Sequence, residues 1–228
     1  MTDKRTELSG KDKILAKLTS FLEKNKTMLW IILAILVAAI IVVAVIDSVT
    51  SKKANESAQR IESVQKDYEE WLGIEEDDSE KDAEQQILVE ELDAVISEYP
   101  SSYAAQRALY LKAGINFKNN EWAEAAVLFT ESADVNRDSY LAPIALMIAA
   151  SSYENAGSYQ NAIDIYLNIY ADYDKVYPDV PRAMLSIGRL QEQLGNKDAA
   201  VDAYNELLDT YPGSGWASFA RTRIIQLD

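Results

Sequence analysis

The chain has 228 residues, of which 37 are acidic and 22 basic, so its formal net charge at pH 7 is −15. It contains no cysteine and no histidine, which excludes zinc sites of the usual kind, thiol nucleophiles, disulfides and histidine-based acid–base catalysis. With only eight glycines and five prolines, and with alanine, leucine, glutamate and glutamine recurring, the composition predicts an all-α protein.

Residues 1–27 form a charged leader that includes an amphipathic basic helix at 11–26. Its apolar side chains share one helical face and its lysines occupy the rest, which is typical of a helix lying on the cytoplasmic surface of a membrane. The alternative is a solvated tail whose positive charge only orients the chain. The apolar residues are Ile14, Leu15, Leu18, Phe21 and Leu22, and the lysines are Lys11, Lys13, Lys17 and Lys24.

Residues 28–46 (MLWIILAILVAAIIVVAVI) carry no charge. As a helix rising about 1.5 Å per residue they span roughly 28 Å, close to the hydrocarbon core of a bilayer. They are predicted to form a single transmembrane helix. A buried core helix would keep a polar stripe, which this segment lacks. A cleaved signal peptide is the other alternative, with Val49 and Ser51 as a weak cleavage site, although the apolar run is longer than usual.

The distribution of basic residues predicts the orientation of this span. The leader holds seven lysines and arginines, whereas the first twenty residues after residue 46 hold four, so the N-terminus is expected in the cytoplasm and the C-terminal domain outside it. The whole chain carries −15 and the leader +3, so the remainder carries −18. Such a domain repels nucleic acid and anionic lipid, which favours basic or apolar protein partners.

Two segments connect the span to the rest of the chain. Residues 47–72 are predicted to be a juxtamembrane helix with one apolar stripe, which packs against the following domain or pairs two copies as a short coiled coil. The oligomeric state is left open. Residues 73–86 hold seven acids and are predicted to be a solvated loop, because a calcium loop would need a glycine at its turn. The stripe consists of Ala54, Ala58, Ile61, Gln65, Tyr68 and Leu72.

Residues 87–228 repeat one pattern three times: a small residue in a first helix, a turn, an alanine, and an aromatic residue four positions later. The small residues let two antiparallel helices approach closely, and such hairpins must stack to bury their outer faces. The Tyr-Pro pairs at 99–100 and 211–212 each close a second helix. Residues 87–99 are then the second helix of an irregular extra repeat whose first helix is the juxtamembrane one, and 216–227 caps the stack. The repeated positions are Gly114, Ala150 and Gly188; Ala125, Ala162 and Ala200; and Phe129, Tyr166 and Tyr204.

This pattern resembles the tetratricopeptide repeat (TPR), with the best match in the third copy and extra residues before Pro178 in the second. The resemblance implies an α-solenoid whose first helices line a protein-binding groove. Apolar members of that groove are alternatively inter-repeat core, and Lys118 and Arg189 either grip a carboxylate of a bound peptide or form surface ion pairs. The implied groove residues are Leu111, Ile115, Lys118, Met147, Ser151, Glu154, Leu185, Arg189 and Glu192.

The layout of leader, span, stalk and repeat domain resembles the ancillary subunit of the bacterial SecYEG translocon. The repeats also resemble those of outer-membrane assembly and cell-division-coordinating proteins. The resemblance implies an inner-membrane scaffold with a periplasmic domain that binds the translocon, periplasmic chaperones or their clients. No phosphate-binding motif is present, and no enzymatic activity, cofactor or metal is expected. The alternative is a structural tether or dimerisation anchor whose groove binds no client.

Overall fold

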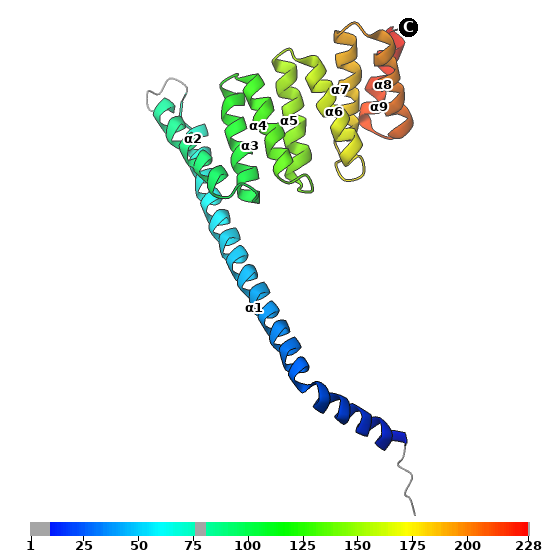
Figure 1. Ribbon diagram of the computed structural model, residues 1–228. Helices are drawn as coiled ribbons and strands as arrows, with labels where there is room; N and C mark the ends of the chain where they lie inside the picture. Colours follow the sequence, from blue (N-terminus) through cyan, green and yellow to red (C-terminus); the bar gives the residue numbers. More distant parts are fainter. Residues whose placement is uncertain (1–9, 76–80, 228) are drawn as a thin grey trace, which may run out of the picture. The chain divides into compact units, whose positions relative to one another are not determined.

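The computed structural model describes residues 10–75 and 81–227, and in these ranges every element is an α-helix. This confirms the predicted all-α class (Figure 1). The helices belong to two compact units, 1–54 and 55–228. They are α1 (Gly10–Leu72), α2 (Lys81–Glu98), α3 (Tyr103–Lys118), α4 (Trp122–Val135), α5 (Leu141–Asn155), α6 (Tyr159–Tyr173), α7 (Val180–Gln193), α8 (Lys197–Thr210) and α9 (Gly215–Leu227).

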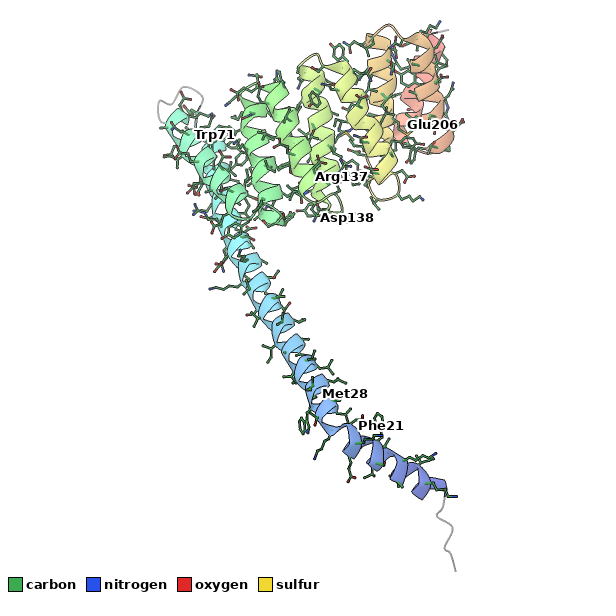
Figure 2. The ribbon with its side chains drawn as sticks, viewed as in Figure 1. Phe21, Met28, Trp71, Arg137, Asp138 and Glu206 are labelled. Atoms are coloured by element: carbon green, nitrogen blue, oxygen red, sulfur yellow. The ribbon has the colours of Figure 1, made fainter. Side chains whose placement is uncertain are left out.

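The first unit contains the apolar part of α1. Within the described residues, α1 is the one helix long and apolar enough to cross a membrane, with a mean hydropathy of 3.4 over its most apolar window and none of that window buried. Figure 2 shows a bend in α1 between Phe21 and Met28. There the Asn25 side chain donates a hydrogen bond to the Phe21 carbonyl oxygen at 2.8 Å, a contact that competes with the helix backbone. The segments predicted as leader helix, span and juxtamembrane helix therefore lie in one helix, which bends between Phe21 and Met28.

The second unit begins with residues 55–72 of α1, which pack against α2 and α3. Ile61, Val64 and Trp71 (labelled in Figure 2) are buried in one cluster with Leu88 and Leu92 of α2. This confirms the predicted extra helix pair.

The buried stripe of this segment differs in part from the prediction. Ile61 and Tyr68 face the domain as predicted, but Ala54, Ala58 and Leu72 are exposed. Ser57, Val64 and Trp71 are buried in their place. The predicted stripe follows residues that recur at alternating intervals of four and three. The helix buries Trp71 in place of Leu72, because the larger ring removes more apolar surface from water.

The acidic segment 73–86 was predicted to be a loop throughout, which is wrong at its C-terminal end. α2 begins at Lys81, and Asp82 and Glu84 lie in its first turn. Carboxylates stabilise the N-terminus of a helix through the macrodipole, so part of the acidic run favours helix there. The remaining acids of the run at 76–80 lie outside the described residues.

The three hairpins α3–α4, α5–α6 and α7–α8 turn through the same backbone conformation. Asn120, Gly157 and Gly195 have φ of 62°, 73° and 80°, at intervals of 37 and 38 residues. In the second hairpin, the Gly157 N–H donates to the Glu154 carbonyl and the next N–H to the Tyr153 carbonyl. This is the Schellman closure that a left-handed residue permits, and its recurrence supports the repeat register.

The repeated alanines and aromatics form the centre of the stack. Ala125, Ala162 and Ala200 have no exposed surface, and the three aromatic rings four residues later are buried. The glycines are less uniform. Gly188 lies directly under the ring of Tyr204, from its own hairpin, whereas Gly114 faces the Tyr68 hydroxyl of α1. Gly114 thus provides space for the preceding first helix.

The two Tyr-Pro pairs follow the ends of α2 and α8, as predicted. After the first, Ser102 caps α3 by accepting a hydrogen bond from the Ala105 N–H at 3.1 Å. The Tyr211 hydroxyl donates to the Asp174 carbonyl at 3.4 Å, and Tyr173 makes the equivalent bond to the Arg137 carbonyl at 2.9 Å. The counterpart of Tyr211 in the second repeat is therefore Tyr173, and the extra residues lie between it and Pro178.

Candidate functional site

The first helices of successive pairs share one surface, formed by residues 55–72 of α1 and by α3, α5, α7 and α9. We call this surface the inner face. Leu111, Ile115 and Met147 are 8, 1 and 3% exposed and belong to the hydrophobic clusters, which is the core alternative for the apolar members of the groove. Leu111 also lines a hollow of this face that is described below. Lys118 is exposed, and Ser151 and Leu185 are partly buried.

The predicted residues Glu154 and Arg189 lie together on this face. The Arg189 Nη2 is 2.5 Å from the Glu154 Oε2, which joins α7 to α5. The other oxygen of Glu154 accepts a hydrogen bond from the Tyr166 hydroxyl at 2.8 Å. Burial and the nearby charge of Glu154 raise the pKa of Tyr166 to about 12, so the hydroxyl stays protonated and donating. Arg189 therefore forms an intramolecular ion pair, one of its two predicted alternatives.

The same arrangement recurs one repeat later. Glu192 accepts hydrogen bonds from the Tyr204 hydroxyl at 2.5 Å and from the guanidinium of Arg223 on α9. The Arg223 hydrogen bonds lower the pKa of Glu192, and burial together with the Glu192 bond raises the pKa of Tyr204. The two clusters thus join α5, α7 and α9 in series along the inner face.

The first repeat lacks all three members of this cluster. In its register Lys118 takes the place of the glutamate, Phe129 that of the tyrosine and Ser151 that of the arginine. An ion pair of the same type therefore does not form between α3 and α5. This leaves the N-terminal part of the inner face with a different surface chemistry from the C-terminal part.

At that N-terminal part the inner face is hollowed. A cavity of about 440 Å³ lies between residues 55–72 of α1, α3 and the start of α5, which is within the usual range for ligand pockets. We call it the tyrosine pocket. It is lined by Gln65, Tyr68, Glu69, Leu72, Tyr103, Arg107, Tyr110, Leu111, Tyr140 and Leu141.

The rim of the tyrosine pocket is held by a short polar network. The hydroxyls of Tyr103 and Tyr140 share a hydrogen bond at 2.5 Å. Arg107 lies over the Tyr103 ring, 5.8 Å from its centroid, and its Nη1 is 2.6 Å from Glu62. Burial, followed by the bond to Tyr140, raises the pKa of Tyr103 to about 12. Tyr140 itself is 71% exposed, so the pocket opens to solvent.

Sequence reasoning missed this pocket because its walls come from three helices that are distant in the chain. One signal was available: Tyr103 and Tyr140 are 37 residues apart, the same interval as the repeat. In the part of the chain that the structure describes, no group of three metal-ligating side chains is clustered.

Comparison with known proteins identifies the repeats. A tetratricopeptide repeat family model matches residues 118–176 and 150–215. Residues 118–215 carry tetratricopeptide repeats. A TPR repeat-containing protein of Treponema pallidum is 31% identical over 146 residues, which cover 64% of this chain and 60% of that protein. The chain thus spans less than two thirds of that relative.

Solved TPR structures share the fold at low identity. A tetratricopeptide repeat protein from Parabacteroides merdae matches with a TM-score of 0.53 and 17% identity, over 74% of this chain and 60% of that one. A putative kinesin light chain with TPR-like repeats from Podosopora anserina matches with 0.52 and 12%, over 73% and 86%. TPR domains are typically protein-interaction modules without enzymatic activity. The matched TPR segment begins at Lys118, so most of the tyrosine pocket precedes it.

Proposed function

We propose that this TPR protein is a membrane-anchored scaffold that binds a protein partner on its inner face. The observation that carries the proposal is the open tyrosine pocket, a solvent-accessible hollow on the face formed by the first helices. The surface differs from the rest of the stack, because the ion-pair clusters that cover α5, α7 and α9 stop before it. A TPR stack offers such a surface to protein segments.

The apolar part of α1 supports the membrane anchor. Its most apolar window has no buried residue, and exposing so much apolar surface to water would be strongly unfavourable. The excess of basic residues in the leader supports a cytoplasmic N-terminus and a domain on the opposite side of the inner membrane. Together with the resemblance to the translocon subunit, this favours a role in protein translocation or envelope biogenesis.

Photocrosslinking in cells tests partner binding by the full-length chain. A photoreactive amino acid at Tyr140, on the pocket rim, is expected to capture a defined partner. Matched positions on the second helices are Val127 and Leu167, which are 45% and 46% exposed, and we expect no specific product from them. Equal capture from all three sites, or none from Tyr140, contradicts the proposal. Products only from a probe at Val49 on α1 would instead support a tether.

The absence of native cysteine makes topology directly testable. Glu121→Cys places one thiol on the exposed turn before α4, and Lys13→Cys places one in the leader. In intact spheroplasts, a membrane-impermeant maleimide is expected to label only the first variant. Labelling of the leader alone would reverse the proposed orientation. Loss of an N-terminal epitope tag from the mature protein would show that a signal peptide had been cleaved.

A further inference from the structure

We propose that the tyrosine pocket is a receptor for a cationic side chain, a lysine or arginine carried by an extended segment of the partner protein. This inference rests on the proposed function, because it names the chemistry recognised at the same site. It concerns the part of the inner face built from α1, α3 and the start of α5.

The pocket lining is suited to a long cationic side chain. Leu72, Leu111 and Leu141 supply an apolar wall, against which the aliphatic stem of a lysine or arginine can be buried. The four tyrosines of the lining present rings with negative faces, which attract ammonium and guanidinium groups.

Two hydroxyls in the pocket are free to accept hydrogen bonds from such a cation. Among the described residues, Tyr68 and Tyr110 make no hydrogen bond to protein through their hydroxyls. Burial raises the pKa of both groups, which keeps them neutral and leaves their oxygen lone pairs as acceptors.

The charges of the lining favour a cation over an anion. Arg107 is the basic residue of the lining, but its guanidinium is paired with Glu62 at 2.6 Å and lies over the Tyr103 ring. Glu69 is the acidic residue of the lining, and its described contact is a neutral hydrogen bond from Gln65 at 2.9 Å. Arg107 and Glu62 neutralise each other, so the carboxylate of Glu69 leaves the pocket with one uncompensated negative charge.

The net charge of the chain also favours a cationic segment. The residues after the leader carry −18, and a field of that sign attracts basic segments and repels acidic ones. A partner segment with a carboxylate or a free C-terminus at this point would meet Glu69 and an arginine that is already paired. The pocket is therefore suited to a cation, whereas Arg189 and Lys118 were considered as groups that bind the carboxylate of a peptide.

Peptide binding to the full-length chain in detergent micelles tests the inference. The probes are three fluorescein-labelled heptapeptides that share two leucines on each side of a central lysine, norleucine or glutamate, with glycine at both ends. Fluorescence anisotropy is expected to show the lysine peptide binding about fivefold more tightly than the norleucine peptide, with the glutamate peptide weakest. Raising the salt concentration should reduce the lysine preference.

Two variants locate the effect, each with a matched control. Glu69→Gln and Tyr140→Ala are expected to abolish the lysine preference. Glu124→Gln removes an exposed acid on α4, and Tyr159→Ala removes a tyrosine of α6, so both should retain it. Circular dichroism confirms that each variant folds.

Three results would overturn the inference: norleucine binding as tightly as lysine, glutamate preferred, or no peptide binding at millimolar concentration. A lysine preference that persists in Glu69→Gln and Tyr140→Ala would place the cation elsewhere and also overturn it. These outcomes are separable from failure of the proposed function, because capture of a partner from Tyr140 in cells does not depend on the charge of the bound segment.

Discussion

Adding one methyl group at Gly188 tests the packing of the TPR stack. A Cβ at this position lies 2.3, 2.6 and 2.7 Å from three ring carbons of Tyr204. Ordinary contact begins at 3.4 Å, so the ring would have to move by about 1 Å to relieve the overlap. Tyr204 has no exposed surface and its hydroxyl is held by Glu192. The ring therefore cannot move without displacing α7 or α8.

The net cost follows from two opposing effects. Overpacking in a core typically costs about 1–3 kcal/mol, and three overlapping ring atoms place Gly188→Ala at the upper end. Alanine is favoured over glycine inside a helix by about 1 kcal/mol. We expect Gly188→Ala to lower the free energy of unfolding by about 2 kcal/mol, which corresponds to a fall in Tm of roughly 4–8 °C for a domain of this size.

Gly114→Ala is the matched control, because Gly114 occupies the same position in the first repeat. Its Cβ would lie 2.6 Å from the Tyr68 hydroxyl, and the next atom is at 3.5 Å. The contact is with the end of a half-buried side chain, which can rotate away. The helix propensity of alanine then dominates, so this variant should be unchanged or up to about 1 kcal/mol more stable.

Denaturant unfolding of the full chain in detergent micelles measures both variants. Tryptophan fluorescence reports on the domain through Trp71, Trp122 and Trp216, while Trp30 in the apolar part of α1 adds a constant background if that part stays helical in the micelle. Wild-type stability in Gly188→Ala, or an equal loss in the two variants, would refute the packing derived from the Tyr204 ring.

Three further predictions test the repeat register and its electrostatics. Ala200→Leu should destabilise the fold by about 1–3 kcal/mol in thermal melts, whereas Ala123→Leu, at an exposed site of α4, should not; equal effects would contradict the register. Gly157→Ala should cost about 1 kcal/mol and Asn120→Gly should stabilise by up to about 1 kcal/mol, because both positions have positive φ; opposite signs in denaturant unfolding would exclude the shared turn. The hydrogen bonds from Arg223 lower the pKa of Glu192 from its ordinary value of 4.5. The ion pair therefore stabilises the fold fully above pH 4.5, and this stabilisation is lost as the pH falls through the lowered pKa of Glu192. The stability difference between wild type and Glu192→Gln should therefore shrink in acid, and a difference that grows in acid would contradict this sign.

The repeat pattern and the candidate span could be recognised from the sequence because both depend on local chemistry. An uncharged run of 19 residues at 28–46 indicates a membrane-spanning helix by length and hydropathy. The alanines at 125, 162 and 200 indicate close helix contacts, because any larger side chain would keep the backbones apart. The structure confirms that these alanines have no exposed surface.

The groove depends on which neighbouring helices cover each side chain, and the sequence contains no local signal for that. The sequence left Met147 as either a groove residue or inter-repeat core, and the structure places it in the core, 3% exposed. The sequence left Arg189 as either a carboxylate-binding group or a member of a surface ion pair, and it could not identify Glu154, 35 residues away in the chain, as the partner. The helical period gives the face on which a residue lies but not the distance to the next helix.

The tyrosine pocket is the feature that local sequence predicts least. Each tyrosine in isolation is an ordinary helix residue, and the spacing of Tyr103 and Tyr140 only repeats the period of the stack. The sequence by itself determined the helices, their pairing and their order, since these follow from periodicity and small side chains. Only the tertiary structure determined that α1, α3 and α5 diverge enough to leave a cavity, because that depends on how three separate surfaces pack together.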